Sequence, residues 1–271
     1  MATIPALAEL LEAGVHFGHR VSKRHPKMQP YLFGSRNDIS IINLEETRTK
    51  LAAACDAVRA LAAEGKTILF VGTKDQARSM VQSAADRVGM PHVTGRWLGG
   101  TITNFAIIGK LIQKYRGLCR QRDTGELQQK YTKFEQGELL KEIDRLADAV
   151  GGIAELNRIP DAIFVVDICE EEIAIREANR SGVTTFAICD SNVDPTTVTY
   201  PIPGNDDAVS AVSLLVRVFT DAVADGIQER ARTMASSAPT PSAKIAESEP
   251  VIVVPEPTVV AEEEDGDAVA A

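Results

Sequence analysis

The chain has 271 residues, 44% hydrophobic and 25% charged, a composition typical of a globular protein with length for one large or two small domains. It has no apolar run of the roughly 18–20 residues that span a bilayer, no signal-peptide pattern and no Cys-x-x-Cys pair, so we expect a cytoplasmic protein without a membrane segment or redox motif. The net charge of −9 disfavours nucleic acid as a partner only if the charge is spread evenly.

The first part of the chain predicts a short helix, a long loop, a strand and a long helix. Leucines at helical spacing predict a helix that ends at Gly14. The segment 14–36 is rich in Gly, Pro, His and basic residues, and we expect it to be a functional loop. Ile39–Ile42 predicts a strand, and Asn43 is expected to cap a helix that ends near Ala63.

Strands and helices then alternate along most of the chain. The predicted strands are continuous apolar runs, which are typical of strands covered on both faces. These strands are 67–71, 92–94, 162–166 and 184–189, and the helices after them are 75–88, 171–181 and, beyond a proline-rich loop at 190–205, 205–224. The alternation predicts a three-layer α/β/α body with a parallel sheet, of the flavodoxin-like or Rossmann-like type.

Two features depart from this alternation. Residues 104–150 predict two helices joined by a turn, with a capping box at Thr132-x-x-Glu135, so we expect an antiparallel helical hairpin inserted into a domain spanning 1–225. Past Gly226 the composition shifts to Ala, Ser, Pro, Glu and Val. We therefore expect residues 226–271 to be an acidic tail, disordered from about residue 233.

Charge is distributed unevenly. Residues 226–271 hold nine acidic and three basic residues, so this tail carries −6 and the first 225 residues only −3 of the total of −9. Two stretches of the body, 16–36 and 89–122, are basic and contain no acidic residue. Their basic residues are Arg20, Lys23, Arg24, Lys27 and Arg36 in the first, and Arg96, Lys110, Lys114, Arg116, Arg120 and Arg122 in the second. A bound polyanion explains this pattern, and a solvated basic face is the alternative.

The second stretch contains the motif 96–105, Arg-Trp-Leu-Gly-Gly-Thr-Ile-Thr-Asn-Phe. A Gly pair lets the backbone turn sharply, and we expect Thr101, Thr103 or Asn104 to cap the helix that follows. Trp97 is the only tryptophan of the chain. It could stack on a nucleic-acid base or anchor local packing, and the sequence leaves both interpretations open.

Three groups suggest other chemistry. Gly72-Thr73-Lys74 follows a predicted strand, as a phosphate-binding loop does, but the Walker and Gly-x-Gly-x-x-Gly patterns of nucleotide sites are absent. The alternatives to a nucleotide site are contact of Lys74 with an RNA phosphate and an ordinary turn. Asp190, Asp194, Asp206 and Asp207 lie near strand ends, where catalysis or Mg²⁺ competes with turn and cap roles. His16 and His19 have His-x-x-His spacing, for which zinc competes with phosphate binding and packing.

Several long motifs in one order resemble the bacterial ribosomal protein 2 family of the small subunit. The resemblance covers about residues 5–225. The matching motifs are 11–19 (LEAGVHFGH), 26–37 from Pro-Lys-Met to Arg-Asn, 70–74 (FVGTK), 96–105, 160–162 (PDA) and 200–207 (YPIPGNDD).

The resemblance implies a structural, non-catalytic protein that binds small-subunit ribosomal RNA and neighbouring ribosomal proteins, with no cofactor, metal or small-molecule substrate. We expect phosphate contacts to dominate. The candidate RNA-binding residues are His16, His19, Arg20, Lys23, Arg24, Lys27, Arg36, Lys74, Arg96, Trp97 and Asn104. The alternative is a cytosolic α/β enzyme that binds a phosphorylated small molecule through the Lys74 loop and the Asp cluster.

Overall fold

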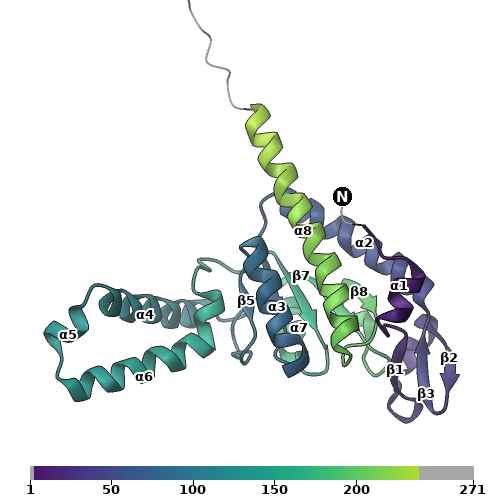
Figure 1. Ribbon diagram of the computed structural model, residues 1–271, viewed down its shortest axis with the longest axis horizontal. Helices are drawn as coiled ribbons and strands as arrows, with labels where there is room; N and C mark the ends of the chain where they lie inside the picture. Colours follow the sequence, from purple (N-terminus) through teal and green to yellow (C-terminus); the bar gives the residue numbers. More distant parts are fainter. Residues whose placement is uncertain (1–2, 238–271) are drawn as a thin grey trace, which may run out of the picture. The chain divides into compact units, whose positions relative to one another are not determined.

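The computed structural model describes residues 3–237, with side chains through residue 234. Figure 1 shows a central parallel sheet, which confirms the predicted α/β class. Its five strands lie in the order β5-β4-β6-β7-β8, and they are β4 (Ile68–Val71), β5 (His92–Val93), β6 (Ala162–Val166), β7 (Thr184–Cys189) and β8 (Tyr200–Pro203). No helix among the described residues is long and apolar enough to cross a membrane.

Helices cover both faces of this sheet, because its central strands β4 and β6 are apolar and buried at every position. In β4, Ile68 and Phe70 point to one face and Leu69 and Val71 to the other, and all four are fully buried. The first face packs on α2 (Leu44–Ala63), α3 (Asp75–Val88) and α8 (Val209–Ser237). The second packs on α7 (Glu172–Ser181) and on the base of a helical hairpin.

That hairpin occupies the region in which an insertion was predicted, 104–150. It consists of α4 (Phe105–Asp123), a short α5 (Glu126–Lys130) and α6 (Lys133–Val150), followed by a turn of 3-10 helix, η3 (Gly151–Ile153). Thr132 and Glu135 form the predicted capping box at the start of α6. Buried side chains of α4 and α6, among them Ile112 and Leu146, continue the core of the second sheet face.

The prediction of a loop over 14–36 is wrong, because this segment folds into most of a second, antiparallel sheet. After α1 (Leu7–Glu12) come β1 (Phe17–Arg20), η1 (Val21–Lys23), η2 (Pro26–Tyr31), β2 (Leu32–Arg36) and β3 (Ile39–Ile42), and the strands lie in the order β1-β3-β2. Between β2 and β3 stand Asn37 and Asp38, with φ of 51° and 60°. Two left-handed residues of the Asn/Asp type form the tight hairpin turn that suits the twist of paired strands.

Two further boundaries differ from the predictions. The predicted loop 190–205 contains η4 (Pro195–Thr197) and the edge strand β8. At its end, the Asn205 side chain accepts hydrogen bonds from the backbone N–H groups of Asp207 and Ala208 just ahead of α8, as expected of a cap. Helix α8 runs to Ser237, past the predicted end near Ala224. The predicted tail 226–271 therefore begins within α8, and from residue 238 it lies outside the described residues.

Gly226 marks a close crossing between α8 and α2. A Cβ atom at this glycine would lie 2.3 Å from the carbonyl oxygen of Arg59 and 2.7 Å from Cβ of Ala62. Since real side chains do not approach backbone so closely, only glycine allows the two helices to meet here.

Candidate nucleic-acid interface

The outer face of the small sheet carries a row of two arginines around one isoleucine. Arg20 of β1 and Arg36 of β2 both pair with Ile39 of the central strand. Directly paired residues of antiparallel strands point to the same face, and adjacent strands are about 4.8 Å apart, so the two arginine backbones lie about 10 Å apart. We call Arg20, Ile39 and Arg36 the arginine row.

A bulge in β1 adds an aromatic ring to this face. Phe17 and Arg20 are three residues apart, and a regular strand would point them to opposite faces. The register of β1 shifts between them, so that Phe17 pairs with Ile41 while Arg20 pairs with Ile39. Because Ile39 and Ile41 share one face of β3, the ring of Phe17, 48% exposed, lies on the same face as the arginine row.

The cations of this segment differ in whether the fold already neutralises them. Arg20, Lys23 and Arg36 are exposed and Arg24 is half-buried, and none has a carboxylate within 4.0 Å among residues 3–234. Lys27 instead places its ammonium 2.6 Å from Asp194 and 3.1 Å from the Thr196 hydroxyl. The first four are therefore available to an external anion.

The motif 96–105 folds around the carboxylate of Glu177, which comes from α7. One carboxylate oxygen accepts from the Trp97 indole N–H at 3.2 Å and from the Gly100 N–H at 2.7 Å. The other accepts from the Ile102 N–H at 3.0 Å and from both the N–H and the hydroxyl of Thr103 at 3.1 Å. Burial opposes the charge of Glu177, but these hydrogen bonds outweigh it and lower the pKa of the carboxyl.

These contacts decide most of the local questions that the sequence left open. Trp97 is 8% exposed and anchors packing, and Gly100, with φ of 91°, makes the expected turn. The prediction of a side-chain cap is wrong: Asn104 occupies the N-cap position of α4 without a side-chain hydrogen bond, and the hydroxyls of Thr101 and Thr103 donate instead to the Leu98 carbonyl and to Glu177. Arg96 and Asn104 are exposed, and RNA contact by these residues and Trp97 stays a prediction.

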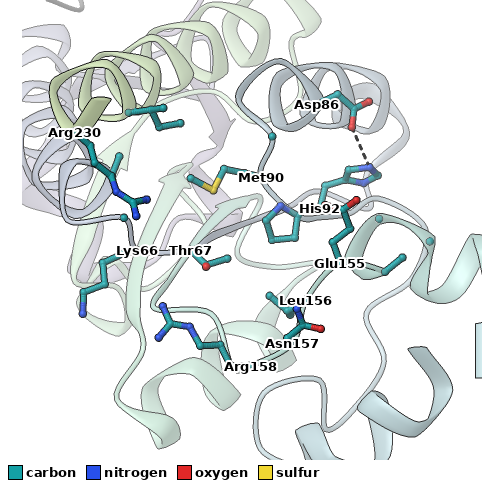
Figure 2. Close-up of a pocket in the computed structure, with 18 residues that line it drawn as sticks. Lys66, Thr67, Asp86, Met90, His92, Glu155, Leu156, Asn157, Arg158 and Arg230 are labelled. Carbon is teal, nitrogen blue, oxygen red and sulfur yellow. Dashed lines mark ion pairs between the residues drawn. The ribbon is translucent and has the colours of Figure 1, made fainter. Parts of the chain in front are cut away.

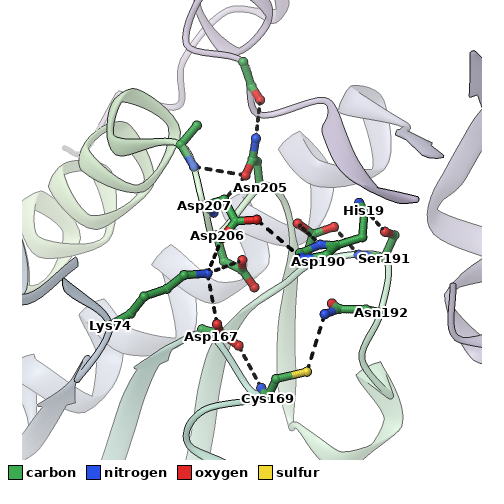
Figure 3. Close-up of polar contacts among 12 residues, drawn as sticks. His19, Lys74, Asp167, Cys169, Asp190, Ser191, Asn192, Asn205, Asp206 and Asp207 are labelled. Atoms are coloured by element: carbon green, nitrogen blue, oxygen red, sulfur yellow. Dashed lines mark hydrogen bonds and ion pairs between the residues drawn. The ribbon is translucent and has the colours of Figure 1, made fainter. Parts of the chain in front are cut away.

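The loop at Lys74 faces carboxylates in the folded chain. Its ammonium lies 3.0 Å from Asp167, 2.9 Å from Asp206 and 2.6 Å from Asp207 (Figure 3). Burial opposes the charge of Lys74, but hydrogen bonds to Asp206 and Asp207 outweigh it and raise the pKa. The Thr73 N–H donates to Glu171, so the groups that would cradle a phosphate already have internal partners.

His19 reaches the same cluster from β1, whereas His16 does not belong to it. The His19 ring lies 3.0 Å from Asp190 and 3.5 Å from Asp207, and hydrogen bonding to Asp190 raises the pKa of His19 against the effect of burial. The His16 ring centroid lies 4.0 Å from that of Phe17, and burial lowers the pKa of His16. The structure does not join the His-x-x-His pair in one metal-ligand group.

Three of the four aspartates grouped from the sequence do meet. Asp190, Asp206 and Asp207 converge with His19, while Asp194 lies instead with Lys27. Burial and the charges of Asp167 and Asp190 raise the pKa of Asp206 to about 7, although Lys74 opposes this rise. Sequence reasoning missed Asp167 and Glu177. The signal for Asp167 was its place directly after a buried strand, and for Glu177 an acid on the apolar face of a helix.

The second basic stretch lies on the hairpin, beyond the β5 edge of the large sheet, whereas the small sheet lies near its β8 edge (Figure 1). Part of its charge is neutralised internally, since Lys114 lies 2.5 Å from Glu142 of α6 and Arg122 lies 3.0 Å from Asp123. Lys110 and Arg120 are exposed, with no carboxylate within 4.0 Å among the described side chains. The two basic stretches therefore form two separate surfaces.

A large cavity, of about 710 Å³, opens at the amino ends of the parallel strands (Figure 2). Polar side chains of its lining already have partners within the chain: Arg158 lies 3.0 Å from Asp161, which is outside the lining, and His92 lies 3.6 Å from Asp86. Ligands of open parallel sheets bind at the opposite, carboxyl ends of the strands. This location does not favour the cavity as a small-molecule site.

Comparison with known proteins gives one consistent result. The family model described as "Ribosomal protein S2" matches residues 10–226. Three similar proteins carry the name "Small ribosomal subunit protein uS2": those of Fusobacterium nucleatum (42% identity, covering 83% of this chain and 92% of that protein), Acidothermus cellulolyticus (42%, 92% and 92%) and Thermobifida fusca (45%, 85% and 79%).

Proposed function

Because the chain belongs to the ribosomal protein S2 family, and is thus a structural component of the small ribosomal subunit in translation and not an enzyme, we propose that small-subunit ribosomal RNA binds the outer face of its small sheet. The observation that carries this proposal is the arginine row: two exposed guanidinium groups on one face without an internal carboxylate. Family membership sets aside the alternative of an α/β enzyme.

Lys23 and Arg24 extend this surface along the chain, and Phe17 adds an exposed ring that a base could stack on. Arginine and lysine neutralise phosphates, and each neutralised phosphate makes binding weaker as salt rises. Such contacts are made to the RNA phosphate backbone and not to the bases. The small sheet therefore contributes to the affinity for RNA and to the position of the protein on it more than to recognition of the RNA sequence.

The remaining predicted residues enter the proposal in two groups. Lys74, His16, His19 and Lys27 lie beside the small sheet or in the polar clusters that support it, so we assign them positioning roles with phosphate contact secondary. Arg96, Trp97 and Asn104 belong to the hairpin base, where exposed Arg96 is the candidate for a second phosphate contact. We also propose that the body is a three-layer α/β/α fold of the flavodoxin-like or Rossmann-like type, because helices pack on both faces of the parallel sheet (Figure 1).

The test compares two double variants with the same change in net charge. Arg20→Gln with Arg36→Gln removes the arginine row, and Arg87→Gln with Arg176→Gln removes two arginines that have carboxylate partners, Asp221 and Glu172. Binding of the purified chain to small-subunit ribosomal RNA is measured by filter retention between about 50 and 300 mM salt.

We expect the arginine-row variant to lower the slope of log affinity against log salt by about 1.5, since each phosphate contact contributes about 0.7–0.9. The control variant should change the slope by much less. Equal slopes for both variants would show that net charge alone matters. Binding by the unmodified chain that ignores salt would overturn the phosphate mechanism.

We also propose that a neighbouring small-subunit protein covers the apolar groove between α1 and the small sheet. Phe33 is 82% exposed and Leu11 54%, and with Leu7 and Leu44 they line a groove of about 340 Å³. Exposed apolar groups gathered in one place indicate a protein contact. Phe33→Ser should lower retention of the chain on isolated small subunits without changing its binding to naked ribosomal RNA, and unchanged retention would contradict this contact.

A further inference from the structure

Three cations from different elements meet on one side of the cavity at the amino ends of the parallel strands. Lys66 lies just before β4, Arg158 lies in the segment before β6, and Arg230 comes from α8. Figure 2 shows their charged ends on the same side of the cavity, whereas Asp86 and Glu155 lie on the other side. We call Lys66, Arg158 and Arg230 the cavity cations. They belong to neither of the two basic stretches, so they form a third cationic surface.

The fold neutralises the cavity cations only in part. The ammonium of Lys66 lies 3.7 Å from one oxygen of Asp161, and the guanidinium of Arg158 lies 3.0 Å from the other. This second oxygen also accepts from the Thr67 N–H at 2.9 Å. Arg230 is exposed and has no carboxylate within 4.0 Å among residues 3–234. Because one carboxylate serves two cations and the third has none, this side of the cavity keeps a surplus of positive charge, which attracts an anion.

The guanidinium of Arg230 lies directly over the backbone of Gly65. A Cβ atom at Gly65 would lie 2.4 Å from Cζ and Nη1 of this guanidinium and 2.9 Å from Nε. Gly65 also has φ of 77°, a left-handed conformation that favours glycine. The charged end of Arg230 thus fills the space of the missing side chain, next to Lys66. A cation that is already positioned in the free protein loses less conformational entropy when it binds an anion.

We propose that the cavity cations bind the phosphate backbone of an unpaired segment of RNA. Arginine binds phosphate through two parallel N–H groups, and lysine binds it as a point charge. A concave, positively charged surface is typical of proteins that follow the backbone of a single strand. The inference rests on the proposed function in one respect, namely that RNA is the polyanion that this chain binds.

This surface and the small sheet lie at opposite ends of the parallel strands. His19 of β1 contacts Asp190, which directly follows β7, so the small sheet meets the carboxyl ends of the strands. Lys66 and Arg158 precede β4 and β6 and therefore lie at the amino ends. A chain that binds RNA at both places bridges two RNA segments across the width of its sheet.

The experiment compares two double variants of the full chain with the same loss of charge. Arg158→Gln with Arg230→Gln removes two of the cavity cations. Arg176→Gln with Arg232→Gln is the matched control, because Arg176, like Arg158, is exposed and paired with one carboxylate, and Arg232 is an exposed residue of α8 about 200° around the helix from Arg230. A third variant, Arg158→Lys with Arg230→Lys, keeps the charge.

The probes are an oligouridylate of about 12 nucleotides and an RNA duplex of the same length. Binding is measured by filter retention between about 50 and 300 mM salt, and circular dichroism checks that each variant is folded. Each variant is made both in the unmodified chain and in the chain that lacks the arginine row. Retention on isolated small subunits is measured in parallel.

We expect loss of the two cavity arginines to lower the slope of log affinity against log salt by about 1.4 for the oligouridylate, at about 0.7 for each phosphate of a single strand. The control should change it by much less, and the lysine variant should keep it. The same loss should appear in the chain that lacks the arginine row, even if the arginine row itself contributes nothing to RNA binding.

Three results would overturn the inference. The first is an equal slope for the cavity variant and its control, which would leave the proposed role of the small sheet intact. The second is a preference of the cavity cations for the duplex over the oligouridylate. The third is a cavity variant that binds RNA like the unmodified chain but is retained less on small subunits, since the partner at this surface would then be a protein.

Discussion

The carboxylate of Glu177 determines the fold of the motif 96–105, and Glu177→Gln tests this directly. The change keeps the size of the side chain but replaces one acceptor oxygen by an NH₂ group. Where the carboxylate accepts from Ile102 and Thr103, the amide would place donor against donor. If the amide turns over, the same conflict arises at Trp97 and Gly100.

The expected loss of stability follows from the number of donors left unpaired. Either orientation leaves at least two N–H groups without an acceptor, and each such group costs about 1–3 kcal/mol when buried. The remaining bonds also lose the strength that charge gives them. We therefore expect Glu177→Gln to lower the free energy of unfolding by about 3–4 kcal/mol at pH 7, a large part of the stability of an ordinary domain.

The effect should depend on pH with a definite sign. The pKa of Glu177 is lower in the folded chain than its ordinary value of 4.5, so its contribution is complete above that value. As pH falls through the folded-state pKa, the carboxyl takes up a proton and the contribution is lost. The stability difference between the unmodified chain and the variant should thus be constant near neutral pH and shrink below about pH 4.

Urea unfolding followed by circular dichroism at pH 7 and pH 3.5 measures both effects. Trp97, the only tryptophan, reports the local change because its indole donates to Glu177, and its emission should shift to the red in the variant. Glu172→Gln is the matched control, since Glu172 lies in the same helix, exposed and paired with the exposed Arg176. A loss below about 1 kcal/mol, or a difference that does not change with pH, would refute the reasoning.

Two further substitutions test the helices. Gly226→Ala should destabilise the chain by about 1–3 kcal/mol in urea unfolding, because the added Cβ would meet the Arg59 backbone. Gly137→Ala, at an open position of α6, is the control and should stabilise the chain by about 0.5–1 kcal/mol. A change of the same sign in both variants would contradict a close contact between α8 and α2 at Gly226. Thr132→Ala should remove the capping box and lower the free energy of unfolding by about 0.5–2 kcal/mol. Amide hydrogen exchange should become faster in α6 and stay unchanged in β4 and β6. Faster exchange in all three elements would show that the hairpin does not unfold independently of the sheet.

The large sheet could be predicted from the sequence because most of its strands are continuous apolar runs, the pattern of strands that are buried on both faces. Strand β8 could not, since Tyr200-Pro201-Ile202-Pro203 carries two prolines, which usually mark a loop. Prolines are tolerated here because, among the strands that the structure describes, β8 lies at the edge and has β7 as its one neighbour. The small sheet was hidden by glycine and proline, although Asn37-Asp38 between β2 and β3 was a readable hairpin signal.

The candidate site, like the fold, could be predicted from the sequence only in part. Local composition was enough to find the basic stretch 16–36 and the aspartates near the strand ends. Which cations the fold neutralises was beyond the sequence, because the partners are distant: Lys27 meets Asp194, and Lys74 meets Asp206. Glu177 is 74 to 80 residues from the groups it binds, and no periodicity connects positions so far apart.

Helix α8 and the match to the family model end at different residues, and the crossing at Gly226 lies where the match ends. Helix α8 continues to Ser237, and from Gln228 to Met234 its side chains are exposed, although Glu229 still lies 3.8 Å from Arg59 of α2. The match to the family model ends at residue 226, at the crossing and not at the end of the helix. The family match thus ends at the residue where α8 crosses α2, while the helix itself continues for a further eleven residues to Ser237.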